Sequence, residues 1–461
     1  MTNSTLPLPP RNAPTWSSRL TFILAATGSA VGLGNIWKFP YITGENGGGA
    51  FVLVYLLCIL LAGIPVMIAE VLLGKQGRSS PVFAVQRLAL EAGRSRHWRW
   101  LGALGVVAGV LILSYYSVIA GWALAYLPKM LAGDFVGIAG DGSSAIFKSH
   151  LARPAVLLGW HSLFMVMTMA VVIAGVTRGL GRAVEFLMPV LFVLLLILLG
   201  FAIAEGEFMQ AVRYLFSFDN AAALTGKSVL IALGHAFFTL SIGMGAIMAY
   251  GSYMPPAAPV ARTVWVVAVM DTCVALVAGL AIFPIVFASP DLDPASGPGL
   301  LFVSLPVAFG GMPAGVLFGT LFFALVSVAA WTSSISLIEP AVAWLVDSGR
   351  ARRWQAGVIL GVLCWAIGVG SVLSFNDWQD WHLLGGFNWF ELSDFLTANL
   401  MLPLGGILMA IFVGHLYSTQ AVRKALDIEG WLYRLWHFVL RWVSPVLVAV
   451  VLVYGLIGVF T

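Results

Sequence analysis

Two apolar segments of this sequence are interrupted by closely spaced glycines at matching positions. Residues 28–35 read GSAVGLGN, and residues 239–246 read TLSIGMGA. Each glycine costs a helix about 1 kcal/mol relative to alanine, so two glycines one residue apart mark a point where the backbone can leave the helix. Unwound carbonyls attract a cation, and the N-terminus of a half-helix attracts an anionic group. The pattern therefore predicts a site that binds a cation together with a zwitterion.

Helix packing is the alternative explanation for these glycines. Gly28 and Gly32 form a small-xxx-small face, which membrane helices commonly use for close approach. Packing does not require the same break in two separate segments, whereas unwound backbone in a bilayer must face protein, ligand or ions. The matching positions therefore favour the binding site.

These breaks lie in a chain that is far too apolar for an ordinary soluble protein. Of its 461 residues, 60% are apolar and 10% are charged, and the mean hydropathy is +0.96; soluble chains average about 45–50% and about 25%. Apolar segments of about 18 residues or more, long enough to cross a bilayer as helices, recur eleven times, centred near Val31, Leu61, Leu113, Met165, Leu194, Phe238, Val274, Leu325, Leu363, Leu408 and Val448. The predicted fold is an all-α polytopic membrane protein with breaks in its first and sixth spans.

The basic residues predict how the chain is oriented. With a cytoplasmic N-terminus and eleven crossings, all but six of the 24 lysines and arginines fall on the cytoplasmic side, as the positive-inside rule requires. The exceptions are Lys38, Lys129, Lys148, Arg153, Arg213 and Lys227. The C-terminus then lies outside, and the polar first 18 residues, which lack the apolar core of a signal peptide, form a cytosolic tail.

Three other features, namely a nucleic-acid partner, a disulfide framework and a metal cluster, are disfavoured by the sequence. The basic residues form no groove-sized patch, which argues against a nucleic-acid partner. Cys58, Cys273 and Cys364 all lie in apolar spans without metal-ligand spacing, which argues against a disulfide framework and a metal cluster.

Several longer motifs carry a resemblance to a known family. They are WSSR at 16–19, the stretch 28–40, ENGGGAF at 45–51, GIP at 63–65 with Glu70, GHAFFTLS at 234–241 and WTSSI at 331–335. Together they resemble the neurotransmitter:sodium symporters, and within them the bacterial amino-acid transporter branch. The resemblance implies two inverted five-helix repeats, at 19–204 and 205–418, preceded by the tail at 1–18 and followed by a loop and a last span at 419–461.

The resemblance also implies two sodium sites. The first would use the Ala30 carbonyl, the side chains of Asn35, Thr239 and Asp271, and the carboxylate of the substrate. Because ion and substrate would share that carboxylate, their binding would be coupled. The second would use carbonyls of Gly28, Val31 and Ala329 with the hydroxyls of Thr332 and Ser333. Hydrogen bonds from these hydroxyls back to their own helix are the alternative.

The implied substrate site lies between the two breaks. Backbone amides of Leu33 and Gly34 with the Tyr116 hydroxyl would hold a carboxylate. Carbonyls of Ala30, Phe238 and Thr239 with the Ser241 hydroxyl would hold an ammonium group. The substrate side chain would meet Ile112, Tyr116, Phe238, Met244, Ser333 and Leu337, of which Met244 and Leu337 have simple packing as the alternative role. Monoamine carriers of the family have an aspartate where this chain has Gly32, so we expect an amino-acid ligand.

Asp271 departs from the pattern of many relatives, which have asparagine at this position. Animal members place a chloride near the first sodium site to offset its charge, and the Asp271 carboxylate would supply that offset itself. We therefore expect transport without chloride. A structural, protonated acid is the alternative, although ionisable groups inside membranes are functional by default.

Gates and a hinge complete the implied machinery. Lys38 and Asp394 would close the outer side above Phe238, and Tyr253 with Asp347 would close the inner side. The usual arginine of the inner gate is displaced, and Arg11, five residues before Trp16, is its candidate. Incidental surface pairs are the alternative for both gates. Gly179 and Pro189 match a motif at which the inner half of the fifth span unwinds, with an ordinary proline kink as the alternative.

The resulting prediction is a sodium-coupled symporter that imports neutral, hydrophobic or aromatic L-amino acids by alternating access. No P-loop or nucleophile with a base indicates an enzyme. A proton-coupled amino-acid permease and a non-transporting sensor of the same fold are the alternatives; the permease would lack one of the hydroxyls at 332–333. We expect two Na⁺ ions and no organic cofactor, a monomer or weak dimer, and a bacterial inner-membrane location.

Overall fold

The computed structural model describes residues 14–218, 224–289, 292, 299–383 and 386–460, and all elements in these ranges are helical. Labels with η mark π-helical turns, except the 3-10 turn η3. The first half contains α1 (Arg19–Ala30), η1 (Gly34–Lys38), α2 (Phe39–Glu45), α3 (Gly49–Cys58), η2 (Ile59–Gly63), α4 (Ile64–Gly77), α5 (Pro81–Glu91), η3 (Arg96–Trp98), α6 (Arg99–Ala132), α7 (Gly140–Leu151), α8 (Pro154–Ile173), η4 (Val176–Gly181) and α9 (Arg182–Glu205).

The second half is also built of helices throughout its described part. It contains α10 (Phe208–Phe216), α11 (Gly226–Thr239), α12 (Ala246–Ser252), α13 (Val260–Phe287), η6 (Leu300–Ser304), α14 (Leu305–Gly310), α15 (Gly315–Asp347), α16 (Arg353–Leu373), α17 (Trp389–Phe395), η8 (Leu396–Met401), α18 (Leu402–Ile411), η9 (Phe412–Leu416), α19 (Thr419–Ala425), α20 (Gly430–Phe438), η10 (Val439–Val443) and α21 (Ser444–Phe460).

The number of membrane spans agrees with the eleven apolar segments. Nine helices in the described ranges are long and apolar enough to cross a bilayer, and α1 with η1–α2 forms a tenth span that bends by 49°. The sixth segment is divided into α11, with 14 residues, and α12, with 7, so each half falls below the length of a full span. Both predicted breaks are therefore present, and the all-α membrane fold is confirmed.

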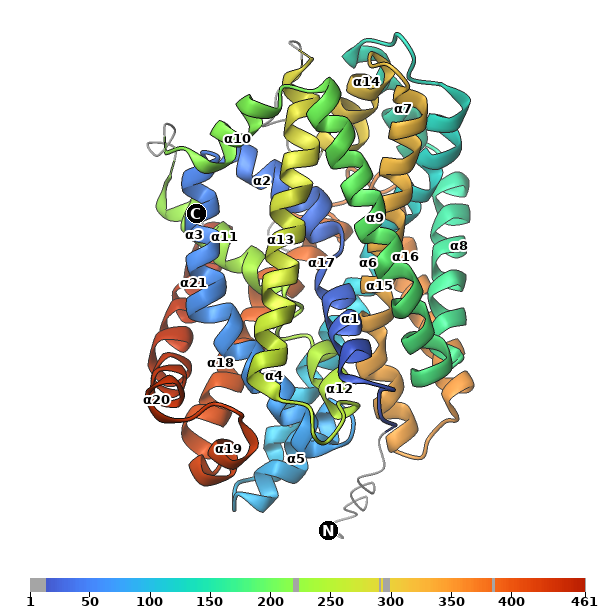
Figure 1. Cartoon of the computed structure of the whole chain (residues 1–461). Coiled ribbons are helices and arrows are strands. Elements are labelled where there is room, and N and C mark those ends of the chain that lie inside the picture. The colour runs from blue at the N-terminus through green and yellow to red at the C-terminus, as the bar shows by residue number, and fades with distance from the viewer. Residues whose placement is uncertain (1–13, 219–223, 290–291, 293–298, 384–385, 461) are drawn as a thin grey trace.

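The broken helices lie inside the bundle. Figure 1 shows α1 between α13 and α9, and α1 contacts α9, α12, α13 and α15. The largest helix–helix contact joins α6 to α15, which together wall one side of the breaks. α21 lies at the edge of the molecule, packed on α18. This arrangement buries unwound backbone, as a bilayer demands.

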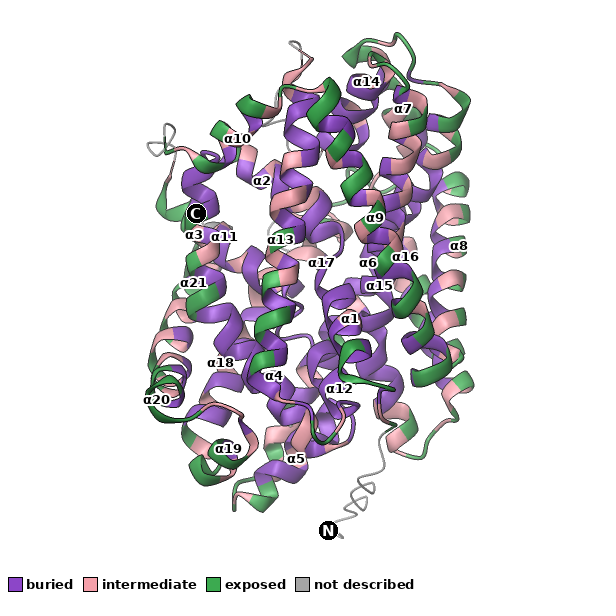
Figure 2. Cartoon of the chain, viewed as in Figure 1, coloured by how far each residue is buried: buried purple, intermediate pink, exposed green. Residues whose placement is uncertain are grey.

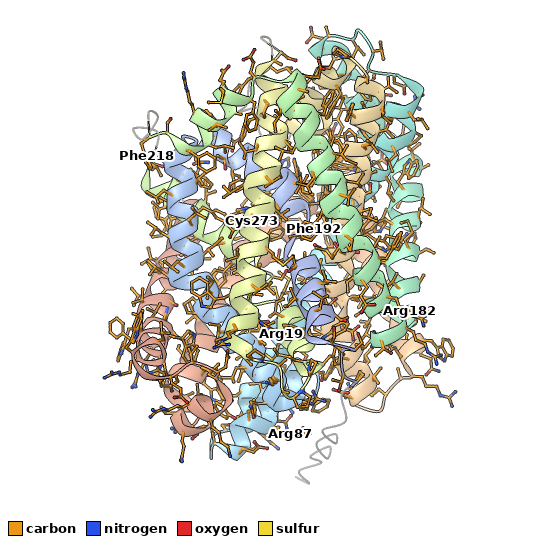
Figure 3. All side chains as sticks on the ribbon, viewed as in Figure 1. Arg19, Arg87, Arg182, Phe192, Phe218 and Cys273 are labelled. Atoms are coloured by element: carbon orange, nitrogen blue, oxygen red, sulfur yellow. The ribbon has the colours of Figure 1, made fainter. Side chains whose placement is uncertain are left out.

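The surface of the molecule matches a lipid environment. Figure 2 shows α1, α12 and α15 largely buried, whereas the outer sides of α8, α9 and α13 carry exposed positions. Many of the exposed side chains are apolar, for example Val193 and Leu196 on α9 and Val450 on α21. In Figure 3 the labelled Arg19, Arg87 and Arg182 lie toward the end of the molecule that holds α5, while Phe192 and Cys273 lie at mid-height. Charge is thus displaced from the apolar middle.

Candidate functional site

The break in the first span frees main-chain carbonyls beside α15. Helix α1 ends at Ala30, and Val31 is extended, with φ −75° and ψ 101°. The Ser333 hydroxyl of α15 reaches across to this end of α1 and lies 3.2 Å from each of the carbonyl oxygens of Gly28 and Val31. The Ser29 carbonyl oxygen is also 3.2 Å away, so four oxygens from two spans converge at this point.

The break in the sixth span depends on left-handed backbone. Ser241, Gly243 and Gly245 have φ values of +54°, +85° and +73°. A Cβ atom on Gly243 would lie 2.5 Å from the Leu402 carbonyl oxygen, so only glycine fits there. The buried Glu70 carboxylate accepts a hydrogen bond from the Gly243 N–H at 3.1 Å and holds the turn. The sequence reasoning used Glu70 only as a motif residue and missed this positioning role.

The two breaks are tied directly to each other. The Ser241 hydroxyl donates to the Ser29 carbonyl oxygen at 2.8 Å, so the loop after α11 is held against the end of α1. The predicted residue Ser241 is thereby a neighbour of the break in the other half of the chain.

A buried carboxylate gathers the side chains predicted for the first sodium site. The Asn35 amide donates to Asp271 Oδ1 at 2.8 Å, and the Thr239 hydroxyl lies 3.0 Å from the same oxygen and 3.1 Å from Oδ2. The Thr239 hydroxyl is also 3.0 Å from Asn35 Oδ1. Asp271 is fully buried, and its neighbours offer only neutral donors. A hard cation fits such a set of oxygens.

The two hydroxyls predicted for the second sodium site behave differently. Ser333 reaches the α1 carbonyls, whereas the Thr332 hydroxyl donates to the Ala329 carbonyl of its own helix at 3.0 Å. The back-bonded arrangement thus holds for Thr332 and not for Ser333. Thr332 still lies beside α1, because its Cβ would be 3.4 Å from a Cβ added to Gly28.

A small cavity lies between the two breaks. Its volume is about 20 Å³, and it is lined by every residue predicted for the substrate except Thr239, together with Ser29 and Gly32. This space is sufficient for roughly one water molecule. An amino acid is larger than this space, and Leu33, Tyr116 and Phe238 separate it from the larger pocket, because all three line both.

The lining of this cavity leaves no room for a side chain at residue 32. A Cβ atom on Gly32 would lie 2.4 Å from the Ser333 hydroxyl and 2.9 Å from the Tyr116 hydroxyl. The Tyr116 hydroxyl accepts a hydrogen bond from the Leu33 N–H at 3.3 Å. The Tyr116 hydroxyl thus packs directly against the backbone of Gly32 and Leu33.

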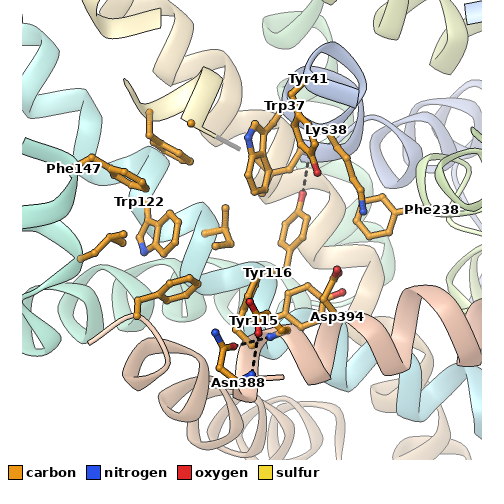
Figure 4. Close-up of a pocket in the computed structure, with 18 residues that line it drawn as sticks. Trp37, Lys38, Tyr41, Tyr115, Tyr116, Trp122, Phe147, Phe238, Asn388 and Asp394 are labelled. Carbon is orange, nitrogen blue, oxygen red and sulfur yellow. Dashed lines mark hydrogen bonds between the residues drawn. The ribbon is translucent and has the colours of Figure 1, made fainter. Parts of the chain in front are cut away.

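A vestibule of about 380 Å³ adjoins that cavity and is shown in Figure 4. Lys38 extends along Phe238, with its Nζ 5.1 Å from the ring centroid, and Asp394 lies across the pocket near Tyr115. Within the described part of the chain, no direct ion pair joins Lys38 to Asp394. The predicted outer gate residues thus share one pocket but remain apart.

The end that the sequence predicts to be the inner one contains an ion pair that the sequence analysis did not identify. Arg353 makes two hydrogen bonds to the buried Glu339 carboxylate, at 2.9 and 2.6 Å, and the Tyr253 hydroxyl donates to Glu339 Oε1 at 2.6 Å. Asp347 instead accepts the Ser80 N–H at 2.6 Å. Tyr253, Asp347 and Arg353 all line a cavity of about 160 Å³. Arg11 lies outside the described residues.

The two predicted hinge residues lie in a π turn and in the helix that follows it. Gly179 lies in the π turn η4, where a Cβ atom would be 2.1 Å from the Val171 carbonyl oxygen, and Pro189 lies inside α9. Between them, Glu185 accepts a hydrogen bond from the Thr21 hydroxyl of α1 at 2.6 Å. The inner halves of the first and fifth spans are therefore tied together at this point.

Comparison with known proteins identifies the family. The profile of the sodium:neurotransmitter symporter family matches residues 13–136 and 148–460. The chain belongs to this family. YhdH, an uncharacterized sodium-dependent transporter of Bacillus subtilis, is 35% identical over 97% of this chain and 98% of its own length. An uncharacterized sodium-dependent transporter of Methanocaldococcus jannaschii is 30% identical over 95% of this chain and 89% of its own length.

A solved structure of similar fold supports the same assignment. The crystal structure of MhsT in complex with L-phenylalanine matches with a TM-score of 0.88 at 40% identity, and the match covers 96% of this chain and 100% of that chain. Family, relatives and fold are those of transporters rather than enzymes. This member of the sodium:neurotransmitter symporter family is a sodium-dependent membrane transporter.

Proposed function

We propose that this transporter couples the entry of two Na⁺ ions to the uptake of a neutral, hydrophobic or aromatic L-amino acid, without a requirement for chloride. The observation that carries the proposal is the buried cluster of Asn35, Thr239 and Asp271 beside the two helix breaks. A cation bound there neutralises the carboxylate at the place where main-chain groups from both breaks are free to hold a zwitterion.

Chemical class and size of the substrate follow from the cavity walls. Gly32 excludes an acidic side chain that would bind an amine alone, so the ligand must bring its own carboxylate for the Leu33 amide and the Tyr116 hydroxyl. Ile112, Met244 and Leu337 line the same cavity and favour an apolar side chain. The presence of L-phenylalanine in the MhsT complex supports this assignment. Binding opens the cavity by displacing Phe238 toward the vestibule.

Alternating access would use both ends of the same pathway. Sodium holds the outer side open, the amino acid binds, and Phe238 with Lys38 and Asp394 closes the vestibule. On the inner side, the cluster of Glu339, Arg353 and Tyr253 must separate for release, with Asp347 beside it. The link from Glu185 to Thr21 must break when the segment between Gly179 and Pro189 unwinds. The basic end of the molecule faces the cytoplasm in this scheme.

Uptake by the purified protein in proteoliposomes tests the proposal. Radiolabelled phenylalanine or leucine should accumulate against a gradient when external sodium is present, and replacing chloride by gluconate should leave the rate unchanged. Loss of uptake in gluconate would exclude chloride independence. Uptake driven equally well by a pH gradient with choline in place of sodium would favour the proton-coupled permease, and no flux under any gradient would favour a sensor.

Competition among amino acids tests the lining of the cavity. Met244→Phe should weaken competition by tryptophan more than competition by alanine, because the ring occupies space that a bulky side chain needs. The concentration for half-inhibition of uptake should rise by about fivefold or more for tryptophan, which corresponds to about 1 kcal/mol of overpacking. An unchanged ranking of the two competitors would remove Met244 from the substrate site.

A further inference from the structure

A cluster of basic and aromatic side chains, well separated from the transport site in the sequence, lies where η9 meets α20 and η10. It consists of His415 in η9, His437 in α20, and Arg441 and Trp442 in η10. The rings of His415 and Trp442 meet edge to face, 5.4 Å apart, and the Arg441 guanidinium lies 5.4 Å from the centroid of the same indole. One tryptophan therefore holds two basic groups in place.

The fixed positive charge of this cluster is that of Arg441, and the two histidines add ring nitrogens beside it. The charged or titratable groups that act on His437 are Arg441 and His415, and Arg441 also acts on His415. Within the described residues, Arg441 Nε is buried and has no hydrogen-bond partner. A buried donor without an acceptor costs about 1–3 kcal/mol, and the cost is higher for a charged group. The cluster is thus suited to an external anion.

Packing fixes the arginine at this position. A Cβ atom on Gly414 would lie 3.2 Å from the Arg441 Cα and 3.4 Å from its Cβ, so the stem of the arginine fills the space above the glycine. Three residues further along the chain, the Ser444 hydroxyl donates to the Leu61 carbonyl of η2 at 2.8 Å. The arginine whose Nε has no partner is therefore held on a fixed backbone.

The depth of the cluster matches a lipid headgroup. Helix α21 continues from Ser444 for 17 residues, about 25 Å of helix, which approaches the roughly 30 Å thickness of the hydrocarbon layer. Arg441 lies three residues before α21, within the apolar helical stretch Gly430–Tyr454 and nearer its start than its end. Trp431, Phe438 and Trp442 are each more than half exposed on the same stretch, as in the aromatic belts at membrane interfaces.

We propose that His415, His437 and Arg441 bind the phosphate of an anionic phospholipid, with Phe438 and Trp442 against the upper part of its acyl chains. Basic pockets between membrane helices on the cytoplasmic side bind such headgroups, and each lysine or arginine near the surface, here Arg441, contributes about 1 kcal/mol. The lipid bridges η9, at the end of α18, to η10, and so fastens the last span to the rest of the bundle.

Thermal unfolding of the full-length protein in neutral detergent tests this site. Phosphatidylglycerol should raise the midpoint temperature, and phosphatidylcholine should not. Arg441→Gln should require about fivefold more phosphatidylglycerol for half of the effect, because it loses about 1 kcal/mol. The matched control is Arg434→Gln, which removes an exposed arginine from α20 outside the cluster and should respond like the wild type.

Other outcomes would overturn the proposal. Equal weakening by Arg434→Gln and Arg441→Gln would indicate diffuse attraction between the membrane and a basic surface. Stabilisation by inorganic phosphate or glycerol phosphate that equals the effect of phosphatidylglycerol would indicate a free-anion site. If Arg441→Gln fails to fold, His437→Gln decides, with an expected reduction in the same direction. These measurements require no transport, so they are independent of the proposed substrate and ions.

Discussion

The two candidate sodium regions flank the same break in α1 but differ in charge. The first is built around Asp271, a fully buried carboxylate that receives hydrogen bonds from Asn35 and Thr239. The second consists of uncharged groups, in which the Ser333 hydroxyl points at the Gly28 and Val31 carbonyls. A buried charge without a partner costs several kcal/mol, whereas an uncharged oxygen cage does not.

This difference predicts an order of affinity for the two ions. At Asp271 a cation supplies charge compensation that neutral donors cannot supply. At Ser333 a cation must displace hydrogen bonds that already satisfy the hydroxyl and the carbonyls. We therefore expect the first region to hold its ion more tightly and the second region to release its ion first. Variants of Asp271, Ser333 and Thr332 test each half of this comparison.

Asp271→Asn should have the largest effect. Losing the carboxylate leaves a bound cation without its counter-charge, at a cost of about 3 kcal/mol or more, so sodium affinity should fall about 100-fold. Added chloride should restore part of the affinity if the carboxylate serves as the fixed anion. Sodium-dependent thermal stabilisation, measured in chloride and in gluconate, checks both points.

Asp427, an acid that lies between α19 and α20 and contacts the start of α13, supplies the control for this variant. Asp427 accepts the backbone N–H groups of Ala261 and Arg262 at the other end of α13. Asp427→Asn should leave sodium affinity unchanged, because its carboxylate lies at the start of the span. If both variants weakened sodium binding alike, the effect would come from helix α13 as a whole, and the difference between the two regions would disappear.

The sequence was sufficient to predict the breaks and the residues around them. Glycine pairs in apolar segments have few explanations, so the unwound points at 31–33 and 240–245 follow from local chemistry. The convergence of Asn35, Thr239 and Asp271 required the family resemblance as well, because these residues come from three different helices. The types of these side chains and their order along the sequence do not predict that the three residues lie close together in space.

Residues missed by the sequence analysis act through partners distant in the chain. Glu339 was a detectable signal, since an acid inside an apolar segment is functional by default. Its partner Arg353 starts the next helix, where a basic residue is explained equally well by the positive-inside rule. The turn that Glu70 holds is likewise visible only in the fold. For the gates, Lys38 and Asp394 share a pocket, but their separation depends on the conformation that the chain adopts.

Ser333→Ala should have an intermediate effect on the second region. The variant removes one oxygen from the set that faces Gly28 and Val31, which costs about 1 kcal/mol, so sodium affinity should fall about fivefold. Sodium-dependent stabilisation should be measured without amino acid, because Ser333 also lines the substrate cavity. Ser334→Ala is the matched control, since the Ser334 hydroxyl donates to Trp331 of its own helix. An equal effect of both variants would remove Ser333 from the ion site.

Thr332→Val should have the smallest effect on sodium affinity. It tests whether a hydroxyl that is hydrogen-bonded to its own helix can become a sodium ligand. In the present structure the Thr332 hydroxyl donates to the Ala329 carbonyl, and that carbonyl is itself a predicted ligand. Sodium binding must break this bond, so the net contribution of the hydroxyl is the difference between two interactions of similar strength. We expect sodium affinity to fall about twofold to threefold, which corresponds to about 0.5 kcal/mol.

The conservative variant Thr332→Ser shows whether that small change comes from the hydroxyl or from the shape of the side chain. Thr332→Ser keeps the hydroxyl and should retain sodium affinity, whereas valine keeps only the shape. If Thr332→Val weakened sodium as strongly as Asp271→Asn, the hydroxyl would be a dominant ligand, and charge would not distinguish the two regions. If valine had no effect and serine reduced affinity, only packing against Gly28 would matter, and the second site would consist of Ser333 and the carbonyls alone.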